Sequence, residues 1–468
     1  MKKTAKHFYF WLSLITLCGL GIRMLNINYS SLWADELYSA LLAHPGNSWY
    51  EVLYIQRAYQ PPLYAFILWI WVKIFAYNEF YIRLLTVLAG TACIWVSGIL
   101  GKKIKNPQLG IILALMVTFN PVQIWYSLEA RFYVFIYLFS ALSLLLYWYI
   151  ITHKPVNKAI YLVKAGVDAA LCYFHHFGII FIFAQFIFDI ALWYKSKDHS
   201  LFFTKLASFL LAGLLYAPWV LWGLTEGMAV KQYWLKTIDI GSYLTFNLGY
   251  PFVINLLTIF FIAVFLWQIF KQRNLLFSLF PFLCFMVTLV PVIYSIIKMP
   301  LLVDRYAMVM APALYCMVAL GILYLLNWFE HNALWKYLTG IACMLAFAWP
   351  GLSESFFDKS KLDKQPWREM GQWLNQQPDF DSTPIYVNGA FVKKMVNIDF
   401  YLKNNEKALA LQSLVPGQHK KMYLVETNAV WKIKDSVLKR LDSSYTISQI
   451  PFNKGKVNFG NIYVCEKK

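Results

Sequence analysis

The sequence has 468 residues, of which 59% are hydrophobic, 19% are aromatic and only 14% are charged, and its mean hydropathy is +0.50. This composition excludes an ordinary soluble domain and indicates an α-helical polytopic membrane protein. The formal net charge of +18 does not argue for nucleic acid, because the basic residues are scattered over short segments between apolar runs. Cytoplasmic anchoring explains most of them, so we expect membrane lipids as partners and no nucleic acid.

Eleven apolar stretches predict transmembrane helices, since a span needs about 20 mostly apolar residues. The first run follows three lysines as in a signal peptide, but no small-residue cleavage site follows it, so we interpret it as an uncleaved helix. The predicted spans lie near residues 8–26, 81–101, 108–125, 132–151, 159–174, 177–194, 204–222, 251–270, 276–296, 306–327 and 334–350.

A shorter apolar stretch, residues 62–76, follows Pro61 and is either a twelfth span or a helix at the membrane surface. If it lies at the surface, the lysine-rich loops fall on the same side as the lysine-rich N-terminus. We therefore expect eleven spans in the inner (plasma) membrane, a cytoplasmic N-terminus and an extracytoplasmic C-terminus.

The predicted division is a multi-spanning domain over residues 1–350, with a first outer loop at 27–80, and a small α/β domain over 351–468 on the outer face. The second region alternates strand-like runs ("PIYVNG", "KKMYLVE", "GNIYVCE") with helical ones ("WREMGQWLNQQ", "AVWKIKDSVLKRL").

The first outer loop contains adjacent acids, Asp35 and Glu36, in "SSLWADELYSALLAHPG". A carboxylate that is partly removed from water can act as a general base on a hydroxyl. The alternative is an exposed loop acid, or acids that cap the first turn of a helix.

Further polar residues fall at the same predicted boundary. Arg131 is suited to bind a phosphate with paired donors, unless Glu129 simply neutralises it. The adjacent His175 and His176 suit hydrogen bonding to a phosphate or sugar, or interfacial anchoring. Arg305, beside Asp304, is a third basic feature, or half of a structural pair.

No metal or cofactor is indicated. Six of the seven cysteines lie inside apolar runs, and neither a disulfide framework nor a metal-ligand spacing is visible. A divalent metal would have carboxylates and histidines available, but no spacing argues for one.

Arginines near a carboxylate base are the minimal equipment for moving a sugar from a polyprenyl phosphate to a hydroxyl. The phosphate is already a leaving group, and cations stabilise the charge that develops on it.

The ordered motifs "SLWADELYS", "QPPLYAFILWIWVKIF", "NEFYIRLLTVLAG", "NPVQIWYSLEARFY", "YFHHFGIIFIFAQ" and "DRYAMVMAPAL" resemble bacterial C-type (GT-C) glycosyltransferases. Within these, the resemblance is to the group of protein O-mannosyltransferases and aminoarabinose transferases (glycosyltransferase family 39). It covers roughly residues 20–320, and "KQPWREMGQWL" resembles the start of the outer domain that many members carry.

The resemblance implies an inverting transferase that uses a polyprenyl-phosphate sugar as donor and a lipid, glycan or protein hydroxyl as acceptor. It implies Asp35 as general base and Glu36 as the second catalytic acid, which holds either Asp35 or the acceptor. Contacts to the donor phosphate fall on Arg131 and Arg305, with the two histidines as additional candidates.

Gln60, Glu129, Tyr133 and Asp304 complete the predicted substrate-binding set. The sequence has Gln60 where family members carry His or a Glu-Lys pair before proline, so a phosphate-binding lysine is missing there. The segment from Leu224 to Tyr250 is a candidate cover for the acceptor.

Two other classes stay open. A non-catalytic transporter or a flippase for lipid-linked glycans would need charges through the bilayer middle, where Asp168 and Asp189 are the main candidates. Within enzymes, a polysaccharide polymerase or ligase is separated from a transferase only by the acidic motif.

Overall fold

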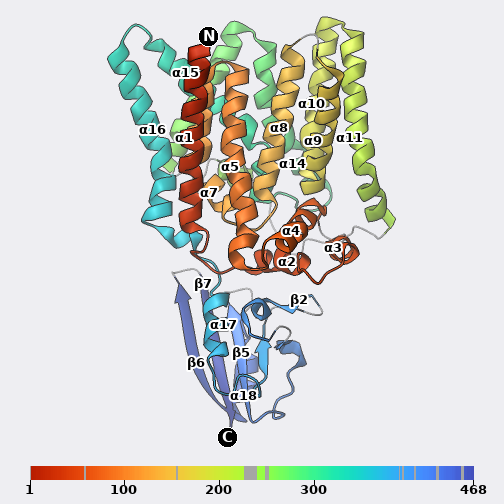
Figure 1. The fold of residues 1–468 in the computed structure, drawn as a ribbon, viewed down its shortest axis with the longest axis vertical. Helices are drawn as coiled ribbons and strands as arrows, with labels where there is room; N and C mark the ends of the chain where they lie inside the picture. Colours follow the sequence, from red (N-terminus) through yellow and green to blue (C-terminus); the bar gives the residue numbers. More distant parts are fainter. Residues whose placement is uncertain are drawn as a thin grey trace.

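The computed structural model describes residues 2–56, 60–153, 156–225, 240–247, 252–388, 390–392, 395–404, 407–427, 432–454 and 458–468. A long helical bundle carries a smaller sheet-containing domain at one end (Figure 1). The N-terminus lies at the other end of the bundle, so the two termini mark opposite ends of the molecule.

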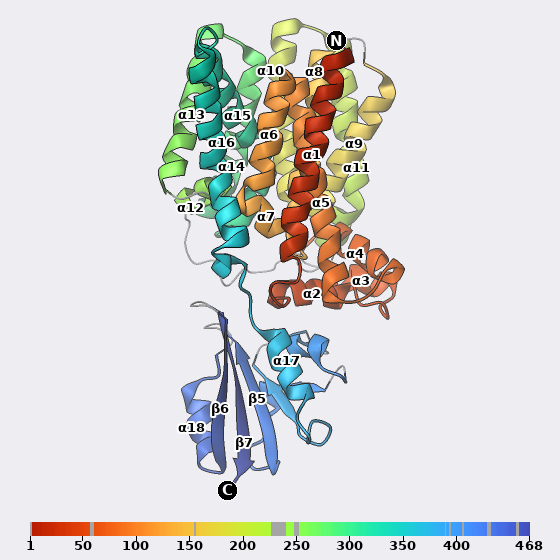
Figure 2. The same cartoon turned by 60° about the vertical axis from the view of Figure 1, so that its left-hand side comes forward.

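All eleven predicted spans are helical. They correspond to α1 (Lys2–Asn26), α5 (Glu79–Ile104), α6 (Pro107–Phe119) with α7 (Pro121–Ser127), α8 (Tyr133–Thr152), α9 (Lys158–Phe174), α10 (Phe177–Ser196), α11 (His199–Thr225), α13 (Phe252–Gln272), α14 (Leu279–Ile297), α15 (Ala311–Trp328) and α16 (Ala333–Phe356). Among the described residues, eight helices are individually long and apolar enough to cross a membrane, and the α6–α7 pair makes a ninth. Helices α9 and α16 are outside that set, yet they extend beside the others over the same depth (Figures 1 and 2).

The stretch near 108–125, which we expected to be one straight span, is broken. Helices α6 and α7 meet at a bend of 61°. Pro121 has no N–H to continue the helix, and the side chain of Asn120 accepts from the backbone N–H of Gln123 at 3.1 Å, which starts a new helix. The bend directs the chain after α7 across the end of the bundle.

Small residues let α5 and α6 approach closely. A Cβ at Gly101 would lie 2.8 Å from the backbone of Gly110 on the facing helix. Only glycine fits such a contact, which is a usual basis for helix packing inside membranes.

Three short helices of the first loop lie at the bundle end that faces the C-terminal domain: α2 (Ala34–Leu42), α3 (Trp49–Gln56) and α4 (Leu63–Ile74) (Figure 1). Helix α4 has 12 residues, so its length is about 18 Å against a hydrocarbon core of about 30 Å. This agrees with the surface helix and not with a twelfth span.

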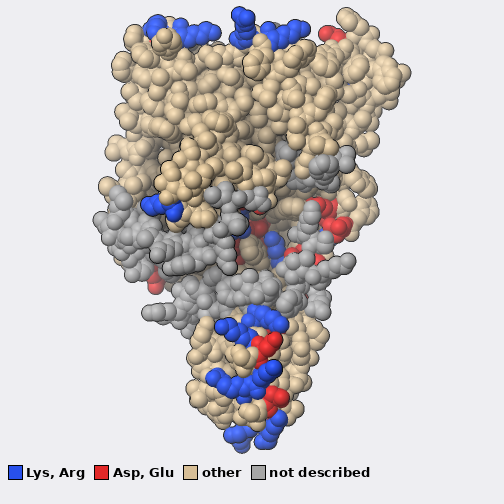
Figure 3. Space-filling model, turned by 180° about the vertical axis from the view of Figure 1, so that it is seen from behind, with Lys and Arg blue, Asp and Glu red and all other residues tan. Residues whose placement is uncertain are grey.

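The remaining short segments of the bundle are α12 (Ile240–Phe246), η1 (Leu275–Ser278) and η2 (Asp304–Val309). Helix α16 continues through Pro350 to Phe356, past the predicted domain boundary at residue 350. Seen from behind, Lys and Arg side chains line the bundle end that carries the N-terminus, and a belt without charged side chains lies below them (Figure 3).

The C-terminal domain has an α/β arrangement. Its five-stranded sheet has the order β4-β1-β5-β7-β6, in which β1 pairs in parallel with β4 and β5, and the β6–β7 hairpin adds antiparallel strands. Each quoted run contains an element of the predicted type among its described residues; in "AVWKIKDSVLKRL", residues 429–431 lie outside them and the helix begins at Asp435. The bounds are η3 (Lys359–Leu362), α17 (Trp367–Asn375), β1 (Ile385–Val387), β2 (Ala390–Val392), β3 (Met395–Val396), η4 (Asn397–Tyr401), β4 (Ala408–Ala410), η5 (Leu411–Ser413), β5 (Lys421–Thr427), α18 (Asp435–Asp442), β6 (Tyr445–Lys454) and β7 (Asn458–Lys467).

Candidate active site at the bundle end

The predicted site residues come from five separate segments. Asp35 and Glu36 are in the first turn of α2, Gln60 precedes α4, Glu129 and Arg131 lie between α7 and α8 with Tyr133 opening α8, the two histidines lie between α9 and α10, and Asp304 and Arg305 begin η2. The space-filling view shows the surface hollowed between the bundle and the C-terminal domain, with charged side chains of both signs visible inside (Figure 3).

The acidic pair is placed by the start of α2. Trp33 is the N-cap residue, and the Glu36 carboxylate accepts from its backbone N–H at 3.2 Å. An acidic first turn also suits the positive end of a helix. Because neighbouring helix residues point in different directions, this turn sends Glu36 into the protein and Asp35 elsewhere.

Glu36 is fully buried and belongs to a closed network. Its two oxygens accept from Arg83 Nε at 2.8 Å and Arg83 Nη2 at 2.7 Å, and one of them also accepts from the backbone N–H of Ala130 at 2.8 Å. Burial acts to raise the pKa of Glu36, but Arg83 outweighs it and the pKa is lowered. The resemblance left Glu36 to hold either Asp35 or the acceptor. With 0% of its surface exposed, Glu36 fits the first of these roles, since it joins α2 to α5 and to the segment before α8.

The Asp35 carboxylate is accessible, because its side chain is 27% exposed. Arg305 Nη2 lies 3.8 Å from its Oδ2 atom. Arg131 approaches from the other side, where its Nη1 donates to the Asp35 backbone carbonyl at 3.3 Å and to Ser39 Oγ at 3.2 Å, and its Nη2 donates to Gln60 Oε1 at 3.1 Å. The acid and both predicted arginines are thus brought together.

Tyr133 lies between the two arginines. Their guanidinium carbons lie 5.5 Å (Arg305) and 6.0 Å (Arg131) from the centre of its ring. Burial acts to lower the pKa of each arginine, but nearby acidic groups, Asp35 among them, outweigh it, so both stay charged. The Nε atoms of both arginines are buried without a hydrogen-bond partner in the described part of the chain. An orphaned donor on the buried Arg131 and another on the half-buried Arg305 are available to an anionic ligand.

Glu129 is buried beside a lysine that sequence reasoning did not select. Lys364 Nζ lies 3.3 Å from Glu129 Oε2 and 5.0 Å from the centre of the Trp33 ring. Burial raises the pKa of Glu129, and its Oε1 atom has no hydrogen-bond partner in the described residues. The only signal for Lys364 in the sequence was its place in the "KQPWREMGQWL" motif.

The histidines do not supply positive charge. His175 packs against Phe132 and Tyr306, and the backbone N–H of Phe177 donates to its Nδ1 atom at 3.1 Å. Burial first, and then His176 and the two arginines, lower the pKa of His175 well below its ordinary value. Burial also lowers the pKa of His176 to about 4, and its Nδ1 atom pairs with the Tyr216 hydroxyl at 2.9 Å. The two histidines were predicted to contact the donor phosphate. As neutral rings they can do so only through hydrogen bonds, without contributing charge.

The C-terminal domain and its linker hold the acidic loop. Gln365 Oε1 accepts from the Ala34 N–H at 3.1 Å, and its backbone carbonyl accepts from the Ser31 hydroxyl. Tyr401 accepts from the Leu32 N–H at 2.7 Å. The start of α2 is thus bonded on both sides, by the bundle and by the outer domain.

Within the described residues, no group of three or more His, Cys, Asp and Glu side chains is arranged to hold a metal ion. Glu226, Tyr233 and Trp234 of the candidate acceptor cover lie outside the described residues.

Comparison with solved structures places this arrangement in a known architecture. ArnT from Cupriavidus metallidurans in the apo state superposes with a TM-score of 0.64 at 11% identity, over 97% of each chain. The fold is that of GT-C membrane proteins. ArnT bound to undecaprenyl phosphate gives 0.62 at 12% identity, over 97% of this chain and 98% of that one.

The archaeal oligosaccharyltransferase AglB from Archaeoglobus fulgidus, in complex with an inhibitory peptide and a dolichol-phosphate, gives 0.51 at 13% identity, over 97% of this chain and 74% of that one. Neither a protein-family model nor a curated protein sequence matches the chain.

Proposed function

We propose that this protein is a membrane glycosyltransferase that moves a sugar from a polyprenyl phosphate to an acceptor hydroxyl at the bundle end facing the C-terminal domain. The observation that carries the proposal is the accessible Asp35 carboxylate between the buried Arg131 and the half-buried Arg305, each of which has an unused Nε donor. The fold supports it, since one structure of that fold holds undecaprenyl phosphate and another a dolichol-phosphate.

In the proposed step, Asp35 takes the proton of the acceptor hydroxyl while that oxygen bonds to the anomeric carbon. The bond from the anomeric carbon to the phosphate oxygen breaks, and its electron pair leaves with the polyprenyl phosphate. Attack opposite the leaving group inverts the anomeric centre. Holding both substrates in line contributes through orientation.

Arg131 and Arg305 are proposed to bind the donor phosphate, with planar donors suited to its oxygens. Their charge stabilises the negative charge that grows on the leaving phosphate. Lys364, beside Glu129, is proposed as a third cation for the donor phosphate. The chain has Gln60 in place of the lysine that some family members carry before proline. Glu36 and Arg83 are assigned as positioning residues that fix the direction of Asp35.

The side of the membrane is part of the proposal. Lys and Arg side chains gather at the bundle end with the N-terminus, beyond the belt without charged side chains (Figure 3), which favours the cytoplasm for that end. The site and the C-terminal domain would then be extracytoplasmic.

The test is release of polyprenyl phosphate by the purified full chain from a panel of polyprenyl-phosphate hexoses and pentoses, with an envelope fraction as acceptor source. Wild type is compared with Asp35→Asn and with Glu51→Gln, a matched loss of charge at an exposed acid of the same loop. We expect Asp35→Asn to lose at least about 100-fold in turnover, as for a general base, and Glu51→Gln to retain it.

Full turnover by Asp35→Asn would refute the base assignment. Absence of phosphate release by wild type with every donor would refute transfer and favour a transporter.

A further inference from the structure

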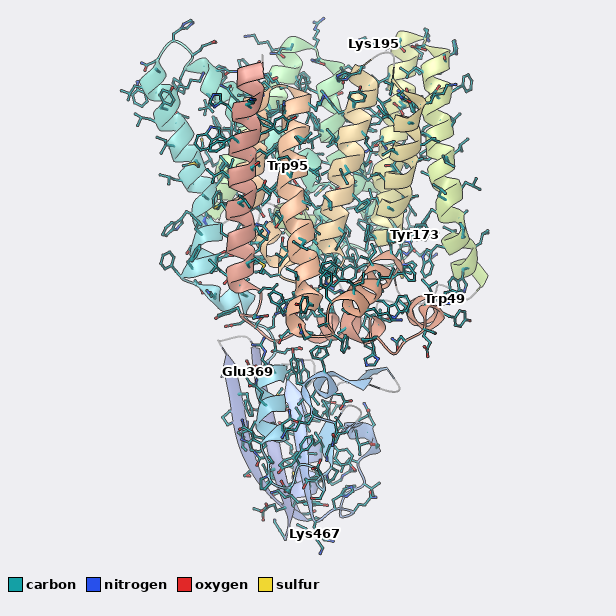
Figure 4. The ribbon with its side chains drawn as sticks, viewed as in Figure 1. Trp49, Trp95, Tyr173, Lys195, Glu369 and Lys467 are labelled. Atoms are coloured by element: carbon teal, nitrogen blue, oxygen red, sulfur yellow. The ribbon has the colours of Figure 1, made fainter. Side chains whose placement is uncertain are left out.

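A second cavity lies at the opposite end of the bundle. It has a volume of about 630 Å³ and is bounded by residues of α8, α10, α11, α13 and η1. Lys195, which lines it, is found at the end away from Trp49 and the C-terminal domain (Figure 4). Helix α10 runs from Phe177, beside the candidate active site, through Lys195 to Ser196, so Phe177 and Lys195 are about 27 Å apart along its axis. The volume lies within the range of ligand sites.

Three cations line this cavity: Lys195, Lys205 and Arg273. Lys195 and Arg273 are exposed, and neither has an ion-pair partner in the described part of the chain. Lys205 is buried, and its Nζ lies 2.5 Å from Asp189 Oδ1. The carboxylate in the lining, Asp198, accepts from the backbone N–H of Leu201 at 3.0 Å at the start of α11. The three cations Lys195, Lys205 and Arg273 are opposed by two acids, Asp189 and Asp198, so the cavity has one positive charge in excess.

The rest of the lining is largely apolar. The apolar side chains are those of Ile151, Leu192, Trp193, Leu201, Phe202, Leu275 and Leu276, and the uncharged polar ones are those of Ser196, Gln272 and Asn274. A soluble anion needs only the cations, whereas a lipid needs cations for its headgroup and an apolar wall for the start of its chains. The lining offers both.

A buried polar network fixes Lys205 from behind. Asp189 also accepts from the Tyr147 hydroxyl at 2.8 Å, while Asp168 pairs with Lys164 and accepts from Ser143 Oγ at 2.7 Å. Charges at this depth are costly unless paired, and the pairing across α8 to α11 prevents Lys205 from turning toward water. Asp168 and Asp189 are the two acids on which a transport path would depend. In this network each of them is paired with a lysine.

We propose that this cavity binds the phosphodiester headgroup of an anionic phospholipid from the membrane leaflet at the N-terminal end of the bundle. Lys195 and Arg273 contact the phosphate, Lys205 supplies the fixed charge at the inner wall, and the first carbons of the acyl chains lie against the apolar side chains. The single excess positive charge matches the single negative charge of a phosphodiester. This site is independent of the proposed sugar transfer.

The test is native mass spectrometry of the purified full chain titrated with phosphatidylglycerol or phosphatidylcholine. Wild type is compared with a Lys195→Gln/Arg273→Gln variant. The matched control is Lys197→Gln/Lys271→Gln, which removes two cations from the same bundle end whose amines lie over aromatic rings and outside the cavity lining.

We expect wild type and control to prefer phosphatidylglycerol, and the cavity variant to bind it at least about tenfold more weakly, as for the loss of charge-assisted hydrogen bonds. Unchanged affinity in the cavity variant would overturn the proposal, as would equal binding of phosphatidylcholine by wild type. Displacement of the lipid by an equal concentration of glycerol phosphate would overturn its lipid part and assign the site to a soluble phosphate ester. The comparison of the two lipids on wild type needs no variant, so the proposal stays testable even if a variant fails to fold.

Discussion

Replacing Glu36 by glutamine tests whether this residue holds the candidate active site together. The two carboxylate oxygens each accept two hydrogen bonds, from Arg83 Nε and Ala130 on one side and from Arg83 Nη2 and Trp33 on the other. A glutamine keeps one acceptor and turns a donor toward the other pair, so two buried N–H groups lose their partner. Of its two carboxylate partners, Arg83 would keep Glu79, whose Oε1 lies 3.8 Å from Nη1, together with its hydrogen bonds to the backbone carbonyls of Ile27, Ser30 and Ser31.

Breaking one partner of a buried ion pair costs about 3–5 kcal/mol. We therefore expect the Glu36→Gln midpoint of thermal unfolding, followed by tryptophan fluorescence in detergent, to fall by roughly 5–10 °C. The Glu51→Gln control should stay within about 0.5 kcal/mol of wild type. An Arg83→Met partner completes a double-mutant cycle, in which the double variant should cost less than the sum of the single variants by about 1–3 kcal/mol.

The sign of the pH dependence gives an independent check. Because the pKa of Glu36 is lowered on folding, its contribution to stability is present above its ordinary value and is lost as pH falls through the folded-state pKa. The stability gap between wild type and Glu36→Gln should therefore narrow on acidification below pH 4.5. Additive single variants, or a gap that widens in acid, would refute the proposed network.

Two further substitutions follow from the site geometry. Lys364→Gln should weaken binding of polyprenyl phosphate by about tenfold, because a charge-assisted contact contributes about 1.5–3 kcal/mol. Lys359→Gln, on the same linker, should leave the affinity unchanged. Equal affinities of the two variants, measured by isothermal titration, would contradict a contact between Lys364 and the donor. The pKa of His176 is lowered to about 4 by burial, so its stabilising neutral form is lost as pH falls from the ordinary 6.5 toward 4. His176→Phe should then lose less stability than wild type over that range, by up to about 3 kcal/mol, in the same thermal assay, and identical pH profiles would show that His176 is not the titrating group.

The helical spans and the outer strands were predictable because their signals are local. Runs of apolar residues and alternating patterns report on the chain within one element, and every quoted stretch contains the expected type of element among its described residues. The break at Asn120 was missed because hydropathy continues across it, although Asn-Pro is itself a helix-start signal. The grouping of Asp35, Arg131 and Arg305 at one bundle end followed from counting spans.

The partners inside the site were not predictable. Lys364 and Glu129 are 235 residues apart, and Glu36 and Arg83 are 47 apart. Nothing in either residue's neighbourhood says which of 42 basic side chains will meet which acid. Asp35 and Glu36 are equivalent candidates in the sequence, and only their directions from α2 separate an accessible acid from a buried one.

By itself, the sequence determined that the chain enters a membrane, where its helices form and on which end its polar residues gather, because burial of apolar runs and charge placement act along the chain. The tertiary structure decided which acid stays accessible, which is neutralised, and that the linker of the outer domain contributes a lysine to the site. Those outcomes depend on distances of a few ångströms between segments far apart in sequence, over which charge pairing is decided.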